Sequence, residues 1–234
     1  MRRVGDEIAL VAAATHRVLA AVGAGDGLDA PSLLPGWTRG HVVTHLARNA
    51  DSFTWLLDGA AADEVREQYP GGAGTRAAAI EAGAGRPAAE LSADLERSAR
   101  RLAAAMARLE PAAWGRQVRL TRGEVPARAL VWSRLREVEV HHGDLGLGYG
   151  PDAWSEGFVA VELPLRIDGL APRLPRGTAV RLVAADRGSS WEVGAGPASM
   201  AVTGSGADLL GWLLGRDDGR RLQAPAGLPP LGPW

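Results

Sequence analysis

REVEVHHGDLGLGY, residues 136–149, is the stretch that decides the fold. In it Glu137 and His141 lie four residues apart, so on a helix their side chains share one face about one turn apart. Glu137 lies in a stretch with the apolar residues Leu135, Val138, Val140 and Leu145. This pattern indicates that its carboxylate faces inward, and a buried carboxylate needs a partner. We therefore expect a helix over about 126–146 that presents Glu137 and His141 as metal ligands.

A second histidine-bearing stretch, GHVVTHLARNAD at 40–51, offers His41 and His45 at the same spacing. Two helices that each direct nitrogen or carboxylate ligands inward can form a metal site inside a helix bundle. Two histidines and one glutamate leave a fourth position open, as in a catalytic zinc site. The spacing alone does not distinguish His41 from His45.

Other polar residues near these motifs allow more than one interpretation. Asn49 lies one turn beyond His45, where it either orients a ligand or substrate or is an ordinary surface group. Glu139 and His142 lie on a different face from Glu137, where we expect them to support the ligands or to lie at the surface or an interface. His16 has no partner at helical spacing and is expected to be a packed or solvated residue.

Composition narrows the classes of function. The chain has 234 residues, 46% hydrophobic and 23% charged, with a net charge of −1 and no basic block, so a globular protein that does not bind nucleic acid is expected. It has no cysteine, so any thiol chemistry must use an external thiol. No apolar stretch is long enough to span a membrane, and we expect a cytoplasmic protein without membrane contact.

All 26 basic residues other than histidine are arginine. An anionic substrate beside a zinc ion would need a fixed positive charge, and arginine recognises carboxylates with two parallel hydrogen bonds. Arg76, which follows a glycine-rich loop, and Arg216, at the end of GADLLGWLLGR, are the candidates. The alternative for each is a solvated surface charge.

Hydrophobic periodicity predicts an α+β protein of two domains. Residues 1–150 are expected to form a bundle with helices at 1–23, 38–57 (Thr38 as its N-cap), 76–83, 87–109 and 126–146, and a hairpin or loop at 118–125. Glycines and a proline at 148–151 indicate the boundary. Residues 151–234 are expected to form a small unit with helices at 154–170 and 205–214, an antiparallel sheet of strands at 178–185, 190–195 and 199–203, and a further strand at 219–224.

Four stretches resemble the mycothiol-dependent maleylpyruvate isomerase family, a branch of the DinB-like metalloenzymes. They are LPGWTRGHVVTHLARNAD, YPGGAGTRAAAIEAGA, REVEVHHGDLGLGY and VTGSGADLLGWLLGR, spread over nearly the whole chain. The resemblance implies a DinB-like four-helix bundle followed by a small domain similar to sterol-carrier folds. It also implies a zinc held by His45, Glu137 and His141, and it assigns Arg76 and Arg216 to catalysis and Asn49 and Arg216 to cofactor binding.

The implied reaction is the cis–trans isomerisation of maleylpyruvate to fumarylpyruvate. Zinc would hold the thiol of mycothiol as a thiolate, which adds to the double bond, permits rotation and is then eliminated. Arg76 and Arg216 would bind the substrate carboxylates or the developing enolate. The expected partners are thus a small anionic substrate and a low-molecular-weight thiol, and the protein would be a monomer or homodimer.

Three alternatives remain open at this point. The first is a mycothiol S-transferase, which would leave the thiol in its product. The second is a zinc hydrolase, which would use bound water and need no added thiol. The third is a non-catalytic metal-binding or regulatory protein, which would show no thiol-dependent turnover.

Overall fold

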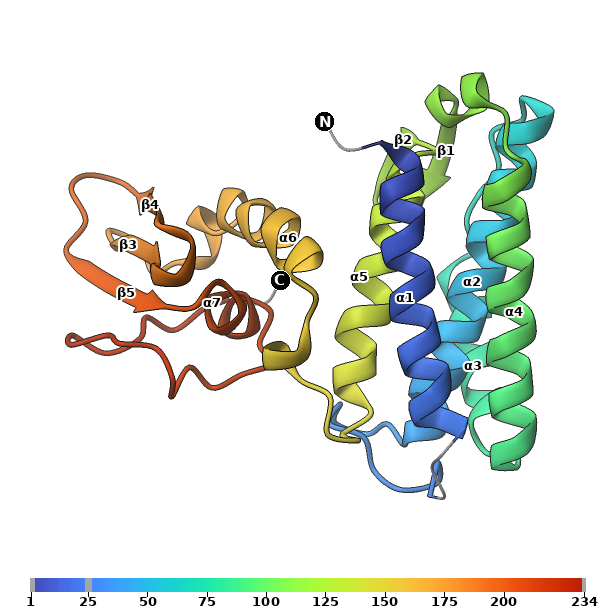
Figure 1. Ribbon diagram of the computed structural model, residues 1–234, viewed down its shortest axis with the longest axis horizontal. Coiled ribbons are helices and arrows are strands. Elements are labelled where there is room, and N and C mark those ends of the chain that lie inside the picture. Colours follow the sequence, from blue (N-terminus) through green and yellow to red (C-terminus); the bar gives the residue numbers. More distant parts are fainter. Residues whose placement is uncertain (1–2, 24–26, 233–234) are drawn as a thin grey trace. The chain divides into compact units, whose positions relative to one another are not determined.

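The computed structural model describes residues 3–23 and 27–232, which form two compact units, 1–147 and 148–234 (Figure 1). Residues 1–2, at the start of the first expected helix, and 233–234, at the end of the chain, lie outside the described residues. Within the described residues, no helix is both long and apolar enough to cross a membrane.

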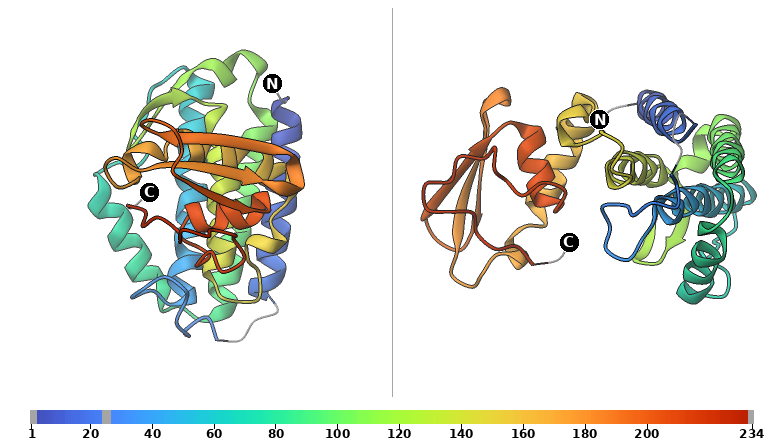
Figure 2. Two further views of the ribbon diagram at one scale, coloured as in Figure 1. Left: turned by 90° about the vertical axis from the view of Figure 1, so that its left-hand side faces the viewer. Right: turned by 90° about the horizontal axis from the view of Figure 1, so that it is seen from below.

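Four long helices build the first unit: α1 (Val4–Gly23), α2 (Arg39–Ala62), α4 (Ala88–Arg108) and α5 (Ala129–Asp144). The end-on view in Figure 2 shows them as neighbouring, roughly aligned coils. Helix α1 packs on α4 and α5, and α2 packs on the same two helices, so α1 and α2 lie diagonally across the bundle. Its core is made of fully buried leucines and valines such as Leu46, Leu95 and Leu135, as expected for amphipathic helices.

The short helix α3 (Ala73–Ala84) packs against the outside of α2. Two glycines permit this close approach. A Cβ on Gly83 would lie 2.6 Å from Cγ2 of Thr44, and a Cβ on Gly40 would clash with the carbonyl oxygen of Ala84. This packing matters for function because α3 carries Arg76.

Helix α2 runs five residues beyond its predicted end at residue 57 and contains Gly59. This glycine allows close packing, since a Cβ there would lie 2.8 Å from Cδ of Arg66. The helix ends where Asp63 adopts a left-handed conformation with φ of 60° and donates its backbone N–H to Ala60. The loop predicted between the helices at 38–57 and 76–83 is correspondingly shorter, because α3 begins at Ala73.

A small hairpin follows α4 and the 3₁₀ turn η1 (Pro111–Gly115). Its strands are β1 (Gln117–Leu120) and β2 (Gly123–Pro126), which settles the choice between hairpin and loop in favour of a hairpin.

The second unit is a three-stranded sheet packed with two helices, α6 (Glu156–Asp168) and α7 (Gly206–Leu213). Its strands are β3 (Ala179–Ala184), β4 (Ser189–Gly194) and β5 (Met200–Gly204), in the order β4-β3-β5. Trp212 on α7 is buried in this unit.

The predicted all-antiparallel sheet was wrong, because β5 pairs with β3 in parallel. The chain turns after β4 and crosses to the far edge of β3, so β5 runs in the direction of β3 and opposite to β4. The strand predicted at 219–224 is reduced to one bridge between Thr203 and Gln223.

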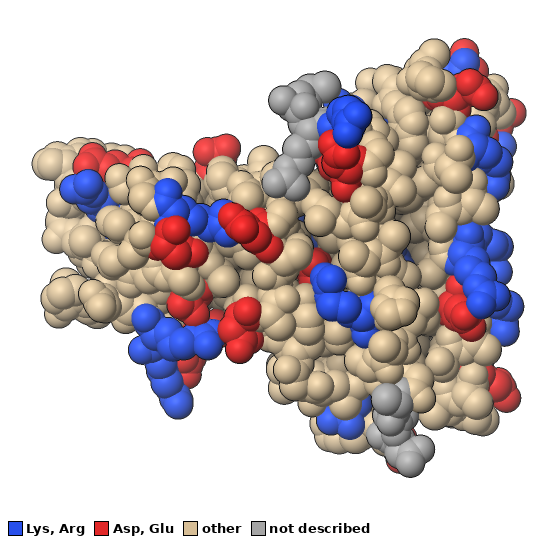
Figure 3. Space-filling view, viewed as in Figure 1, with Lys and Arg blue, Asp and Glu red and all other residues tan. Residues whose placement is uncertain are grey.

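Charges of both signs are intermixed on the face drawn in Figure 3. Many are paired, as in the ion pairs Arg101–Asp51 at 2.5 Å and Arg108–Asp58 at 2.5 Å. Positive and negative side chains therefore balance one another locally, and not only in the net charge of the whole chain.

Candidate metal centre

His45 on α2 and Glu137 and His141 on α5 form a cluster inside the first unit. One potential ligand atom from each residue lies within 4.8 Å of the other two. Glu137 Oε2 is 2.8 Å from His45 Nε2 and 3.5 Å from His141 Nε2. Two imidazole nitrogens therefore converge on one carboxylate oxygen, and two N donors and one O donor suit zinc or another divalent metal.

His41, the alternative ligand on α2, has a different task. Thr38 is the N-cap of α2, and its backbone N–H donates to His41 Nδ1 at 3.1 Å, while the Thr38 side chain accepts from the His41 backbone N–H. The other ring nitrogen of His41 lies 3.3 Å from Glu81. Both ring nitrogens thus have partners at the start of the helix, and His45 is the histidine that reaches Glu137.

A carboxylate orients His141. Asp144, one turn along α5, holds Nδ1 of His141 at 2.8 Å and leaves Nε2 directed at Glu137. Carboxylate partners of this kind fix the tautomer and orientation of metal-binding histidines. Our sequence reasoning missed Asp144, although the spacing H-x-x-D in HHGD places both side chains on one helix face.

The three pKa values are shifted in different directions. Burial lowers the pKa of His45 to about 4, with His141 and Arg76 contributing and Glu137 opposing. Although burial opposes ionisation of Glu137, hydrogen bonds from His141 and His45 hold its pKa well below the usual range. Burial also disfavours charge on His141, but hydrogen bonds with Asp144 and Glu137 raise its pKa. Clustered and perturbed groups of this kind are typical of functional sites.

Arg76 of α3 contacts this cluster directly. Its Nη2 lies 3.0 Å from His45 Nδ1, and its guanidinium carbon lies 6.0 Å from the centre of the Tyr69 ring. A pocket of about 270 Å³ adjoins it, lined by residues of α2, α3 and the segment between them, among them Arg48, Asp51, Trp55, Gln68, Tyr69 and Arg76. Sequence reasoning missed Tyr69 and Trp55, since no spacing rule connects this segment with α2.

Asn49 is buried beside the cluster, with 3% of its surface exposed. Its Oδ1 accepts a hydrogen bond from Nη1 of Arg134 at 2.7 Å. Cofactor binding by Asn49 stays a prediction, and the observed contact ties α2 to α5 one turn from His45.

Arg216 lies in the second unit, where its Nη1 donates to the carbonyl oxygen of Leu214 at 3.0 Å. Its catalytic and cofactor-binding roles stay predictions.

His16 lies on α1 and is not a member of the cluster among the described residues. Glu139 and His142 are buried and also lie outside the cluster, and Glu139 pairs with Arg17 of α1 at 2.8 Å.

Fold and site together define a helix-bundle protein with a two-histidine, one-carboxylate cluster of the metal-binding type. A sequence profile described as the mycothiol maleylpyruvate isomerase N-terminal domain matches residues 8–146. The chain therefore belongs to the mycothiol maleylpyruvate isomerase family, as its sequence motifs predicted. No protein of curated function matches the chain.

Two solved structures resemble the whole chain. A crystal structure of the mycothiol-dependent maleylpyruvate isomerase has a TM-score of 0.89 and 24% identity, covering 100% of this chain and 98% of the other. A mutant of such an isomerase, with one histidine replaced by alanine, also has a TM-score of 0.89, with 23% identity and the same coverage. At this identity the likeness establishes the fold, and the predicted α+β class is confirmed.

Proposed function

We propose that the protein is a zinc- and mycothiol-dependent isomerase that converts maleylpyruvate to fumarylpyruvate. The observation that carries the proposal is the convergence of His45 and His141 on one oxygen of Glu137, within a chain of this family. Three protein ligands leave a position for an external group. When bound, zinc supplies a Lewis acid that lowers the pKa of a coordinated thiol.

The chain's own residues set up this chemistry in two ways. Asp144 fixes His141 so that Nε2 remains directed at the ligand position. Burial keeps His45 neutral above a pKa of about 4, so its nitrogen can act as a ligand at neutral pH.

Arg76 is suited to binding a substrate carboxylate. A guanidinium only donates hydrogen bonds, so Nδ1 of His45 accepts from Arg76 and the ring proton lies on Nε2, toward Glu137. With a metal on Nε2, a neutral His45 would carry its ring proton on Nδ1 and could not accept from Arg76. The guanidinium would then be free to donate to a carboxylate at the edge of the adjoining pocket.

The reaction itself tests the proposal. Zinc-loaded protein should consume maleylpyruvate only when mycothiol is present, and mass spectrometry should recover the thiol unchanged. Thiol retained in the product would instead show an S-transferase, and turnover without thiol would show a hydrolase or another activity. Bound zinc with no turnover of any kind would favour a non-catalytic metal-binding protein.

The ligand set is tested by metal content. His45→Ala, Glu137→Ala and His141→Ala should each lose zinc, because each removes one of three ligands. His142→Ala is the matched control and should keep it, since His142 lies outside the cluster. Normal zinc content in all three ligand variants would overturn the assignment.

The arginines are tested by kinetics at full zinc loading. Arg76→Met and Arg216→Met should keep the metal and lower kcat/KM by about 10- to 100-fold, as expected for a lost charge-assisted hydrogen bond. Unchanged kcat/KM for either variant would remove that arginine from the proposed site.

A further inference from the structure

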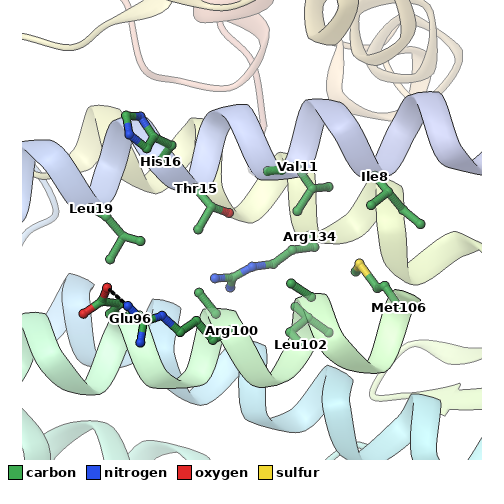
Figure 4. Close-up of a pocket in the computed structure, with 13 residues that line it drawn as sticks. Ile8, Val11, Thr15, His16, Leu19, Glu96, Arg100, Leu102, Met106 and Arg134 are labelled. Atoms are coloured by element: carbon green, nitrogen blue, oxygen red, sulfur yellow. Dashed lines mark hydrogen bonds and ion pairs between the residues drawn. The ribbon is translucent and has the colours of Figure 1, made fainter. Parts of the chain in front are cut away.

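A second cavity lies between α1 and α4, and none of its lining residues belongs to the metal centre. Its volume is about 240 Å³. The lining residues of α1 run from Ile8 to Leu19, about 16 Å at the rise of an α-helix, so the cavity is an elongated groove. Most of its walls are apolar, with side chains of both helices that include Ile8, Val11, Leu19, Leu102 and Met106 (Figure 4).

Arg134 of α5 forms part of this cavity, and Figure 4 shows its guanidinium between α1 and α4. Only 1% of the residue is exposed. Its Nη1 donates to the carbonyl oxygen of Leu46 at 2.9 Å and to Asn49 Oδ1 at 2.7 Å. Its Nη2 is buried without a hydrogen-bond partner, and none of the ion pairs among residues 3–23 and 27–232 includes Arg134.

A buried guanidinium whose hydrogen-bond partners are all neutral is unusual, because a charge without a direct ion pair is costly to remove from water. Burial lowers the pKa of Arg134 to about 10, while the Glu137 and Asp51 carboxylates act through space in the opposite direction, and the group is still charged at neutral pH. Neither carboxylate takes up Nη2, so the open donor of a charged guanidinium points to an anion as the absent partner.

The two ends of the groove differ in polarity. Toward one end lie His16, Leu19 and the ion pair of Glu96 with Arg100, and toward the other lie Ile8, Val11 and Met106 (Figure 4). Arg134 lies between the two ends. A ligand that fits this pattern has one anionic head and a narrow apolar chain.

We propose that this groove binds a medium-chain aliphatic carboxylate, with its carboxylate on Arg134 and its chain directed toward Ile8 and Met106. The proposal is independent of the isomerase activity, because it rests on a different cavity and on a side chain outside the metal cluster.

Calorimetric titration of the full-length protein with octanoate and with 1-octanol tests the role of charge. The two probes share an apolar chain and differ in the head group. Octanoate should bind at least about tenfold more tightly than octanol, because only octanoate forms a charge-assisted hydrogen bond with Arg134. Arg134→Met should abolish this difference. Equal binding of the two probes to the unmodified protein would overturn the proposal.

A pair of alanine variants on α4 tests the location. Ala99 lines the groove and is buried, so Ala99→Leu fills the cavity without removing any polar group. It should weaken octanoate binding at least about tenfold. Ala104→Leu, on the exposed surface of the same helix, should leave binding unchanged. This pair remains informative even if Arg134→Met does not fold.

Two results would contradict the location. The first is octanoate binding that Ala99→Leu does not weaken. The second is a dimer in sedimentation equilibrium that Ala99→Leu disrupts while octanoate fails to bind, which would make the groove a contact between two copies of the chain.

Discussion

Two carboxylates in the first unit are each held by basic side chains, yet their surroundings suit different purposes. Asp94 of α4 accepts hydrogen bonds from Arg48 at 2.8 Å and Arg86 at 2.7 Å. Glu137 of α5 lies between His45 and His141. A guanidinium keeps its proton and cannot bind a metal, whereas an imidazole can lose its proton and offer a lone pair. The partners, rather than the carboxylates, therefore distinguish a structural ion pair from the proposed metal centre.

The comparison extends to what each cluster does to its carboxylate. Both pKa values are lowered against the effect of burial, that of Asp94 by Arg86 and Arg48 and that of Glu137 by the two histidines. In the first case the attraction stabilises the fold. In the second, the proposed metal centre, it would keep a charged ligand available, and a bound cation would take the place of the histidine protons.

Exchanging each carboxylate for its amide should separate the two purposes. Glu137→Gln should lower zinc affinity more than about 100-fold. This exceeds the effect usually seen when a residue that only hydrogen-bonds to a metal ligand is changed. Asp94→Asn should leave zinc affinity unchanged. Competition with a chromophoric chelator measures both, and equal zinc affinities for the two variants would break the comparison.

Asp144 should show an intermediate effect, because it acts through His141. Asp144→Asn should weaken zinc binding by about 10- to 100-fold, the range measured for the groups that orient metal-binding histidines. The same chelator assay applies. A full loss of zinc would place Asp144 among the ligands, and no change would remove its orienting role.

Asp94 should matter for stability instead. Asp94→Asn should lower the free energy of unfolding by about 1–3 kcal/mol, between the values for exposed and fully buried ion pairs, because its arginine partners are partly exposed. Urea denaturation of the metal-free protein measures this. A variant as stable as the parent would show that the two arginines contribute no net stability through Asp94.

The smallest expected effect is the pH dependence of the difference in unfolding free energy between the parent and Asp94→Asn. The pKa of Asp94 in the folded protein lies below its ordinary value of 3.8, so on acidification the unfolded chain takes up this proton first. The stabilisation is thus complete above about pH 5 and is lost as the pH falls through the folded pKa. The difference between parent and Asp94→Asn should shrink below pH 4. A difference that stays constant down to pH 3 would contradict this origin.

The sequence predicted the bundle and its histidine motifs because helical periodicity and i, i+4 spacing are local properties. It did not predict the arginine partners of Asp94, which come from α2 and from the turn before α4. Nor did it reveal that β5 lies beside β3, since strand order depends on tertiary packing. Gly59 shows the same limit, because it allows Arg66 to approach and does not end the helix.

Within the site, spacing placed Glu137 and His141 on one face but left His41 and His45 as equal candidates. The choice depends on the capping interaction of Thr38 with His41, a local motif that could have been recognised from the three-residue spacing. The contact of Arg76 with His45 could not have been recognised from the sequence, because it depends on how closely α3 packs on α2 at Gly40 and Gly83.

The most direct test of the account is the electronic spectrum of the cobalt-substituted protein during titration with mycothiol. If His45, Glu137 and His141 hold the metal and leave a position for the thiol, a thiolate-to-cobalt charge-transfer band should appear and saturate at one thiol per protein. Glu137→Gln should show no such band, and Asp94→Asn should show it in full. A protein that binds cobalt but develops no band with mycothiol would contradict the account.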